Sequence, residues 1–570
     1  MTAEATAATP PVETPPPRGF KLLKAAVRNR KLGVMLALGF SAGLPYALLL
    51  GTLYAWLGEA QVDLETMGVF SLIGLAYAFK FLWSPLVDRL VLPGLERLGR
   101  RRSWLLPIQF ALGGVFITLS SLDPGSMLGW FSLLAGIAAF ASATQDIVID
   151  AWRIDVADEV ATLEILSAIY QLGYRFASLV GGALALIAAA RIGWPAVYFW
   201  MGVAMLVVAG VTLLAPDTPR RAASDGDDPL ALHATVPLRA RRVAIAVIGA
   251  AWTWALVTVV WFMVRSLGAA PGARPDATAF IKLYGPLIVV ATVIVPALVA
   301  AILNGLARSR IPLATHTRPG VVDRTIAHAY GALLMPLAEI VARMRWAAVL
   351  ALGIILTYRL TDAIWGPFAL PFYLQELHYS NDEVAIASKF FGVGMTMAGI
   401  ALGAVLFAVL GRMPTLVLGA AFAAGTNLLY ADLAAGGAGL DVFGRTTGFY
   451  ALAGMLGSDE RLSRLLLAIA GENLAAGLAG AAFVAYLSGI TSKQYSAVQY
   501  ALLSSLTFLV GSLGRGAIGE AIDVRGYAPV FYFTAALGSI AVVLCVFEWI
   551  RTRGGGATGS SGTPDAPASA

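Results

Sequence analysis

The sequence has little charge and almost no cysteine. Only 13% of its 570 residues are charged, whereas an ordinary soluble domain carries about 25%, and 58% are hydrophobic. One soluble core cannot bury this excess of apolar residues. A soluble enzyme, a disordered chain and a nucleic-acid-binding domain are therefore excluded. The single cysteine, Cys545, excludes a disulfide framework and a cysteine-ligated zinc site.

Several functional motifs are also missing. The sequence has no Gly-x-x-x-x-Gly-Lys-Ser/Thr loop, which argues against a pump driven by ATP hydrolysis within this chain. The four histidines lie in connectors or near the ends of apolar runs, without the spacing of metal ligands. Residues 1–17 are rich in Pro, Thr and Ala and lack the apolar core of a cleavable signal peptide. We expect no metal, no cofactor and no cleaved leader.

What the sequence does have is a series of long apolar runs. A membrane-crossing helix needs about 20 mostly apolar residues, and fourteen runs meet this requirement. They lie at 33–57, 68–90, 104–122, 127–150, 161–190, 193–215, 243–265, 280–304, 346–376, 384–411, 413–435, 464–490, 496–521 and 527–550. The chain is therefore predicted to be an all-α polytopic membrane protein.

Basic residues orient these spans, because Lys and Arg accumulate in cytoplasmic connectors. Arginine and lysine cluster in the N-terminal tail, after spans two, six and eight, and in the C-terminal tail, which all fall on one side if every span crosses. The opposite connectors contain few of either. We expect both termini to be cytoplasmic, and the formal net charge of +6 then reflects topology.

The order six spans, two spans, six spans predicts a division of the chain. Two six-helix halves are typical of many transporters, and a hairpin that begins and ends in the cytoplasm keeps both halves in the same orientation. The acidic Asp88 followed by Arg100 and Arg101 fits the connector between helices two and three of the major facilitator superfamily, although a plain positive-inside loop also explains it. The predicted segments are a disordered basic tail (1–32), the first half (33–215), a linker (216–242), the extra hairpin (243–304), a linker (305–345), the second half (346–550) and a disordered tail (551–570). Residues 324–345 fit an amphipathic helix on the cytoplasmic face and a solvated linker helix equally well.

Ionisable residues inside the spans of the first half are candidates for the transport path, because each costs about 2.5–3.5 kcal/mol to insert. Lys80 and Arg175 lie in the middle of spans two and five. Asp146, Asp150 and Arg153 share one helical face, since they are four and three residues apart. Gln145 adjoins that face. Asp150 and Arg153 also fit a structural charge pair near the cytoplasmic end.

The second half carries a similar set. Arg359 and Asp362 lie three residues apart in span nine, where an internal ion pair is an equally good interpretation. Glu472 lies in span twelve. Gln499 and Tyr500 lie in span thirteen.

These residues indicate the kind of substrate. Basic side chains in both halves favour an anionic solute. Aromatic and amide groups such as Tyr174 and Tyr358 favour a sugar or a peptide, although such aromatics more commonly pack or lie at the membrane interface. Buried carboxylates can take up a proton, so Asp146, Asp362 and Glu472 are predicted to exchange a coupling proton.

Several motifs together resemble AmpG-type muropeptide permeases. They include Gly39-Phe40-Ser41-Ala42-Gly43-Leu44-Pro45, Lys80-Phe81-Leu82-Trp83-Ser84-Pro85-Leu86-Val87-Asp88-Arg89, Ala143-Thr144-Gln145-Asp146, Leu172-Gly173-Tyr174-Arg175, Glu472-Asn473-Leu474 and Gln499-Tyr500-Ala501-Leu502-Leu503-Ser504. The resemblance covers most of the chain outside the tails and residues 216–345. Acetyl-CoA transporters have a similar first-half pattern and are the alternative.

The resemblance implies a bacterial inner-membrane transporter that serves peptidoglycan recycling and β-lactamase induction. It would import N-acetylglucosaminyl-anhydro-N-acetylmuramyl peptides with the proton gradient. Our own expectation is a monomer that works by alternating access of its two halves. We expect substrate contacts from Lys80, Gln145, Tyr174, Arg175, Tyr358, Arg359, Gln499 and Tyr500, and gating or structural roles for Asp88, Arg100, Arg101, Asp150 and Arg153. A membrane enzyme or a sensor fits less well, because the connectors contain no catalytic motif and no room for a signalling domain.

Overall fold

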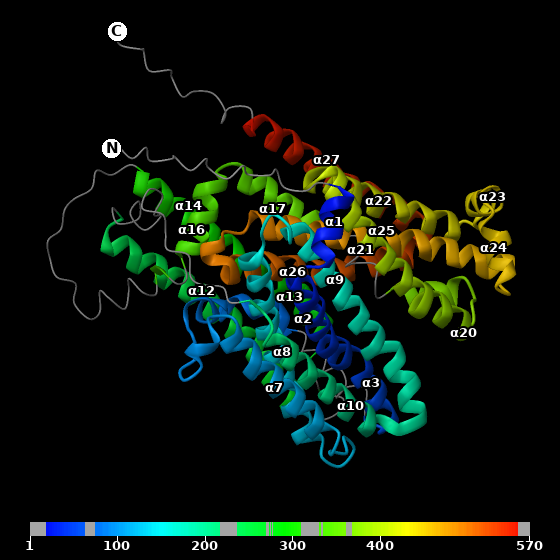
Figure 1. Ribbon diagram of the computed structural model, residues 1–570, viewed down its shortest axis with the longest axis horizontal. Coiled ribbons are helices and arrows are strands. Elements are labelled where there is room, and N and C mark those ends of the chain that lie inside the picture. Colours follow the sequence, from blue (N-terminus) through cyan, green and yellow to red (C-terminus); the bar gives the residue numbers. More distant parts are fainter. Residues whose placement is uncertain are drawn as a thin grey trace, which may run out of the picture.

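The computed structural model describes residues 19–62, 75–216, 236–269, 277–308, 334–360 and 368–556, together with 273, 275, 330 and 331. Within these ranges the chain is helical and contains no strand. The helices run as two bundles that share one end of the molecule, as Figure 1 shows. Because strands are absent from the described part and long apolar helices dominate it, the expected all-α class is confirmed.

The first half contains most of the segments that bear on the site. Its elements are α1 (Phe20–Val27), α2 (Arg30–Ala47), η1 (Leu48–Thr52), α3 (Leu53–Glu59), α5 (Leu75–Phe79), η3 (Lys80–Leu82), α6 (Ser84–Arg89), η4 (Glu96–Leu98), α7 (Arg102–Leu119), α8 (Leu128–Val156), α9 (Leu163–Ser178), η5 (Leu179–Leu184) and α10 (Ala185–Thr212). Here η1 and η5 are π-helical turns, and η3 and η4 are 3₁₀ turns.

The extra hairpin and the second half complete the chain. The hairpin consists of α12 (Leu238–Gly268), α13 (Ala277–Val289), η6 (Val290–Ile294) and α14 (Val295–Arg308). The rest comprises α16 (Met335–Met344), α17 (Ala347–Thr357), α19 (Ala369–Pro371), η8 (Phe372–Glu376), α20 (Asn381–Val384), η9 (Ala385–Phe391), α21 (Gly392–Leu410), α22 (Arg412–Ala434), α23 (Ala438–Thr446), α24 (Phe449–Met455), α25 (Glu460–Ile490), η10 (Lys493–Tyr495), α26 (Ser496–Arg525) and α27 (Tyr527–Gly556).

The number of spans is lower than the predicted fourteen within the described residues. Ten helical stretches there are long and apolar enough to cross a membrane, or eleven if the bent pair α16 and α17 counts as one. One stretch, Leu163–Thr212, breaks at Gly193, whose φ is 78°, and so corresponds to two predicted spans. The predicted spans 68–90 and 346–376 fall partly outside the described residues.

The segment that carries Lys80 is not a continuous helix. It changes from α5 to the 3₁₀ turn η3 and then to α6. Pro85 explains this break, because proline lacks an N–H and its ring clashes with the carbonyl four residues earlier, which belongs to Phe81. The Ser84 hydroxyl donates to that same carbonyl at 2.9 Å. The break places Lys80 on a tight turn that is buried within the bundle.

The chain ends and linkers are more helical than the predicted segments indicate. The tail predicted as disordered contains helix α1. This helix is ordered because Leu22 and Ala26 are buried against the protein, and the Gly19 N–H donates to the Ala408 carbonyl at 3.2 Å. Helix α27 continues to Gly556, past the predicted boundary at 551. Helix α12 begins at Leu238, inside the linker predicted for 216–242.

Glycines allow the helices of each half to pack backbone to backbone. A Cβ on Gly39 of α2 would lie 2.3 Å from the Tyr170 carbonyl oxygen, and one on Gly173 of α9 would lie 2.2 Å from the Leu36 oxygen. The second half repeats this arrangement between α21 and α25, where a Cβ on Gly477 would lie 2.1 Å from the Thr396 oxygen. Small residues at helix interfaces permit such close approach in membranes.

Substitution of Gly173 by alanine is expected to destabilise the first half. The new methyl group would overlap the backbone of α2, and overpacking of this kind costs about 1–3 kcal/mol. Thermal unfolding of the purified protein in detergent measures the effect. Gly114→Ala is the matched control, because a Cβ there has no neighbour within 4 Å. Equal unfolding temperatures for the two variants would contradict close packing at Gly173.

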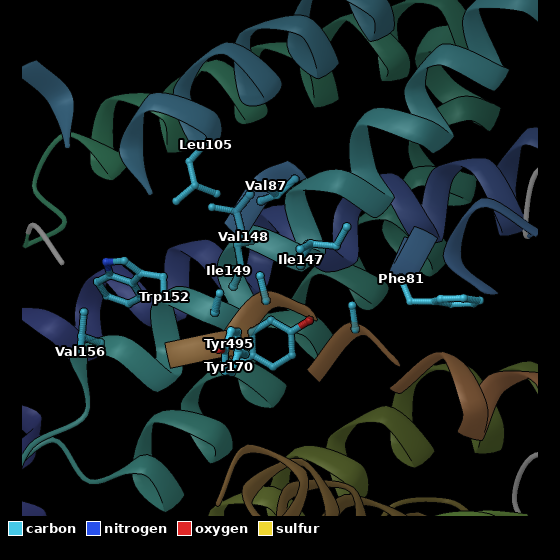
Figure 2. Packing of buried hydrophobic residues seen from close by; sticks show 14 of the residues in the cluster. Phe81, Val87, Leu105, Ile147, Val148, Ile149, Trp152, Val156, Tyr170 and Tyr495 are labelled. Carbon is cyan, nitrogen blue, oxygen red and sulfur yellow. The ribbon is translucent and has the colours of Figure 1, made fainter. Parts of the chain in front are cut away.

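The core beside the site joins both halves. Figure 2 shows Val148 of α8 beside Val87 and Leu105, and the same cluster includes Tyr170 of α9 and Tyr495 of η10. All of these residues belong to one buried cluster. Because Tyr495 comes from the second half, the apolar core continues across the interface between the halves.

The extra hairpin packs laterally on this core. Trp252 of α12 contacts Phe81 edge-on at a ring distance of 5.4 Å. At the other end of the hairpin, the Asn304 amide donates to the Ala338 carbonyl of α16 at 2.8 Å. Met335, Pro336, Leu337 and Ala338 of α16 are buried. The described part of the predicted 324–345 helix is thus packed against protein in its first turn and becomes more exposed toward Arg345.

Candidate functional site

Four charged residues of the first half form a buried cluster, which we call the central charge cluster: Lys80, Asp146, Asp150 and Arg153. The Lys80 ammonium lies 3.7 Å from Asp146 Oδ2 and 3.6 Å from Asp150 Oδ2. The side chains of Lys80 and Asp150 are 8% and 5% exposed, so water screens these charges poorly. Lys80 therefore links η3 to α8.

Arg153 connects this cluster to the second half. Its guanidinium pairs with Asp150 Oδ1 at 3.0 Å and donates to Ser488 Oγ of α25 at 3.1 Å. The guanidinium also lies between two rings, 4.8 Å from the centre of Tyr170 and 5.0 Å from that of Tyr500. A desolvated cation between two rings gains about 2 kcal/mol or more per contact. One side chain thus holds α8, α9, α25 and α26 together.

Two oxygens at the centre of the first half lack hydrogen-bond partners among the described residues. They are Asp146 Oδ1 and Gln145 Oε1, both buried. Gln145 is held in place, since its amide donates to the Ser41 carbonyl of α2 at 2.7 Å. Buried acceptors without partners are costly in a native protein. Their presence at one position marks it as a candidate for binding a proton or a ligand donor.

Aromatic residues surround this position. Tyr46 contacts Tyr77 at a ring distance of 5.3 Å and Tyr174 at 6.0 Å, and Tyr174 contacts Tyr170 at 6.2 Å. The hydroxyls of Tyr77 and Tyr174 lie within electrostatic range of the Asp146 carboxylate. Arg175, half-buried, follows on α9. The arrangement combines stacking surfaces with charge, as recognition of a polar ring requires.

A second set of charges lies where the halves meet. This inter-half network consists of Asp88, Arg100, Arg101, Asp155 and Ser496. Arg101 donates to Asp88 Oδ1 at 3.0 Å, to Asp155 Oδ2 at 2.9 Å and to Ser496 Oγ at 2.9 Å. Arg100 donates to Asp155 Oδ2 at 2.7 Å. The network fastens the connector after α6 to the start of α26.

Further contacts between the halves lie at the same end. Lys493 of η10 donates to the Ala157 carbonyl at 3.3 Å, and Arg412 at the start of α22 lies 3.9 Å from Glu164 at the start of α9. At the opposite end, the tips of the first half (α3, α10) and of the second half (α20, α23, α24) lie apart in Figure 1. These ion pairs and hydrogen bonds of charged side chains between the halves thus lie at one end of the described structure. We call it the arginine-rich end, because it carries Arg100, Arg101, Arg153 and Arg412.

The loop between α8 and α9 is fixed at this end as well. Partial burial raises the pKa of Asp158, but hydrogen bonds from the Lys31 ammonium and the Ala161 and Val160 amides outweigh it and hold that pKa below its usual value. The carboxylate is therefore ionised in the folded protein. The loop stays attached to α2 through Lys31.

In the second half, Arg359 also lies near the interface between the halves. A Cβ on Gly480 of α25 would lie 2.8 Å from Arg359 Nη1 and 3.6 Å from the Gln171 side-chain nitrogen of α9. Gln171 donates to the Gly480 carbonyl at 3.5 Å. Arg359 and Gln171 therefore both lie beside Gly480. Asp362, the predicted partner of Arg359, lies outside the described residues.

Tyr358, Gln499 and Tyr500 are predicted substrate contacts whose polar or aromatic groups are engaged within the protein. Tyr358 donates to the Leu416 carbonyl at 3.0 Å and stacks on Phe483, and it is 2% exposed. Gln499 donates to the Pro336 carbonyl at 2.7 Å and to Glu339 at 2.6 Å. The ring of Tyr500 faces Arg153. Sequence spacing places these residues on helices but does not reveal which neighbours they meet.

Glu472 of α25 lies in an aromatic environment near the other end of the second half. It accepts a hydrogen bond from the Tyr430 hydroxyl, which in turn lies 2.7 Å from the Tyr373 hydroxyl. This chain of hydroxyls joins α25, α22 and η8. It gives a buried carboxylate two neighbouring groups that can hold or pass a proton.

Asp155, Ser488 and Ser496 were not among the predicted site residues, although all three bind the arginines. For Asp155 a signal existed: it is an acidic residue at the end of a span, on the same predicted side as Arg100 and Arg101. For the two serines no signal existed, since serines are common in these helices and only the packing of the halves brings them to an arginine.

Comparisons with known proteins agree with this picture. The family model described as "Acetyl-coenzyme A transporter 1" matches residues 31–128. The chain is 29% identical over 529 residues to the anhydromuropeptide permease of Escherichia coli K12, covering 91% of this chain and 81% of the relative. It is 25% identical over 522 residues to putative transporter AmpG 4 of Rickettsia conorii, covering 91% and 97%.

The fold also matches a solved structure. A XylE mutant carrying two tryptophan substitutions matches with a TM-score of 0.50 at 13% identity, covering 93% of this chain and 96% of that one. The major-facilitator fold and the resemblance to AmpG-type permeases are thereby confirmed. The chain is a multi-pass membrane transporter and not an enzyme.

Proposed function

We propose that this transporter imports N-acetylglucosaminyl-anhydro-N-acetylmuramyl peptides from the periplasm to the cytoplasm of a bacterium by proton symport. The observation that carries the proposal is the similarity to the anhydromuropeptide permease over 91% of the chain. The site agrees in chemistry. Such a substrate has carboxylates that attract cations and sugar rings that stack on aromatic side chains.

The geometry of the two halves supports a set of substrate contacts. Lys80 and Arg175 of the first half and Arg359 of the second attract the carboxylates of the peptide and the lactyl group. Tyr174 stacks on a sugar ring, and Gln145 Oε1 accepts a hydrogen bond from the substrate. Tyr358, Gln499 and Tyr500 are omitted from this set, because their groups already bind the protein.

Proton coupling is assigned to Asp146, with Glu472 and Asp362 as the candidates in the second half. Lys80 is neutralised by two carboxylates, those of Asp146 and Asp150. A proton on Asp146 removes one of these negative charges. The Lys80 ammonium then becomes available to a substrate carboxylate, so that proton and substrate bind together.

Alternating access accounts for the distribution of contacts between the halves. We assign the arginine-rich end to the cytoplasm, because basic connectors remain on that side. The contacts of Arg101 and Arg153 with the second half then close the cytoplasmic side. Breaking them opens that side, while the hairpin α12–α14 stays packed on the bundle. The proposed unit is a monomer with both termini in the cytoplasm.

Uptake into proteoliposomes tests the function. Labelled anhydromuropeptide is expected to accumulate when the outside is made acidic, and a protonophore should abolish accumulation above the external concentration. Uptake that a protonophore leaves unchanged would contradict proton coupling. A deletion strain is expected to release anhydromuropeptides into its medium, and absence of this release would contradict the substrate.

A second candidate is transport of an anionic solute such as acetyl-CoA, which the family model over residues 31–128 favours. The same proteoliposomes distinguish the two. Labelled acetyl-CoA uptake that excess anhydromuropeptide does not reduce would support this second candidate. Under the first proposal, acetyl-CoA is neither transported nor inhibitory.

A further inference from the structure

A cavity separate from the central charge cluster lies at the arginine-rich end of the second half. Its volume is about 240 Å³, equal to the liquid volume of roughly eight water molecules. It lies between the C-terminal ends of α16, α25 and α27 and the start of α22. Four helices that are distant in sequence thus enclose one small space.

The walls of this cavity carry an excess of positive charge. Arg343, Arg412 and Arg551 line it, and the one acidic residue in the lining is Glu548. Two further glutamates pair with these arginines from outside the lining: Glu339 binds Arg343 at 2.7 Å, and Glu164 lies 3.9 Å from Arg412. The lining itself therefore has two more positive than negative charges.

The arginines still have N–H groups to donate. Arg551 uses its Nε and Nη2 on Glu548, both at 2.7 Å, although a guanidinium has five N–H donors. The guanidinium of Arg412 makes no hydrogen bond within the described part of the chain, and its distance to Glu164 exceeds that of a hydrogen bond. The cavity thus contains Arg551, which Glu548 holds in place, and Arg412, whose N–H groups can donate to a ligand.

A buried hydroxyl adds an independent observation. Tyr486 of α25 lines the cavity and is only 2% exposed, and its hydroxyl has no hydrogen-bond partner among the described residues. The charged groups around it are Glu548, Arg551 and Arg412. A buried hydroxyl without a partner costs about 1–3 kcal/mol. An acceptor placed between Tyr486 and the arginines would remove that cost.

From these features we propose that the cavity is a binding site for a phosphate group. A phosphate offers several acceptor oxygens and a charge that matches the lining, and guanidinium groups bind it in a bidentate manner. Helix α27 contributes Glu548, Arg551 and Thr552 to the lining, and its neighbouring residues Val543, Phe547 and Ile550 are 52%, 58% and 61% exposed. Because these apolar side chains face the surroundings at helical spacing, the headgroup of an anionic phospholipid is the favoured source of the phosphate.

Occupancy of this site would also affect the contact between the halves. Arg412 lines the cavity and is at the same time the partner of Glu164 in the first half. A phosphate that draws Arg412 into the cavity weakens this pairing. The site is therefore placed where a lipid can influence the arginine-rich end, whichever substrate the transporter carries.

Binding to the full-length protein tests the proposal in two arms. In the lipid arm, the protein is placed in nanodiscs of phosphatidylcholine with or without phosphatidylglycerol, and retained lipid is measured by native mass spectrometry. In the free-anion arm, inorganic phosphate is added to detergent-purified protein and the unfolding temperature is measured. Selective retention of phosphatidylglycerol supports a lipid headgroup, and a phosphate-dependent rise alone supports a free anion. No response in either arm overturns the site.

Variants distinguish specific binding in this cavity from non-specific attraction of anions to a basic protein. Tyr486→Phe removes only the hydroxyl without a partner, so it should not lower the unfolding temperature, while weakening binding of the responding ligand about tenfold. Arg412→Gln and Arg551→Gln should each weaken binding by at least as much. Arg445→Gln is the control, because Arg445 pairs with Glu460 at the other end of α25. Unchanged binding in the three cavity variants, or equal loss in the control, overturns the proposal.

Discussion

Substitution of Lys80 by alanine is expected to reduce anhydromuropeptide uptake in proteoliposomes to the level of empty liposomes. Lys80 is the cation that lies between Asp146 and Asp150, at 3.7 and 3.6 Å. Its removal leaves two buried carboxylates near one another, with Arg153 as the remaining cation. Removing one partner of a buried ion pair costs about 3–5 kcal/mol. We therefore expect a lower unfolding temperature as well as loss of transport.

A double variant separates these two effects. Lys80→Met combined with Asp146→Asn removes one charge of each sign, so most of the lost stability should return. Transport should not return, since both the ammonium and the titratable carboxylate are gone. Arg191→Met serves as the control, because Arg191 is exposed and bonds only within its own helix in the described structure. Full uptake by the stable double variant would contradict a role of Lys80 in transport.

Replacement of Arg153 by methionine is expected to give the second largest effect, a loss of the closed arrangement at the arginine-rich end. Arg153 is fully buried and binds Asp150, Ser488 and the rings of Tyr170 and Tyr500. Methionine fills a similar space without charge. The interactions across the interface are lost, although each half keeps its own packing.

Spin labels can measure this change. Cysteines at Glu159 and Gln494 are exposed and lie on opposite sides of the interface near the contact between Lys493 and Ala157. In the parent protein one short distance should dominate, and Arg153→Met should broaden and lengthen the distribution. Uptake should fall at least tenfold, because one state of the cycle is destabilised by roughly 1.4 kcal/mol or more. An unchanged distance distribution would show that Arg153 does not hold the halves together.

The sequence predicted the contacts among charged residues better in the first half than in the second. Asp146, Asp150 and Arg153 follow helical spacing, and the structure does place Asp150 and Arg153 in contact. Lys80 was predicted as a charge inside a span, but its pairing with α8 depends on the break at Pro85 and on tertiary packing. Local spacing reports which face a residue occupies and not what lies opposite that face.

In the second half, sequence spacing was even less informative about which residues lie opposite each helix face. Gln499 was expected to contact substrate, yet its amide fastens α26 to α16. The segment that forms α16 follows a long connector. The periodicity of the sequence does not reveal where that connector leads in space. The cavity around Tyr486 was not predicted for the same reason, because its lining comes from four helices and follows no motif. The predicted span count also exceeded the number of spanning helices found among the described residues, in part because the predicted spans 68–90 and 346–376 include residues outside the described part.

The π turns η1 and η5 have a consequence for how the first half can deform. Each inserts an extra residue into a helix, which rotates all faces beyond it by roughly 100° relative to an uninterrupted helix. The two turns are joined, since the Thr52 hydroxyl of η1 donates to the Gly181 carbonyl of η5 at 3.2 Å. Two neighbouring helices therefore each contain an extra residue at the same level of the bundle. If both π turns moved along their helices together, the segments that follow them, α3 and α10, would rotate by the same amount. The close contacts between α2 and α9 at Gly39 and Gly173 would stay unchanged.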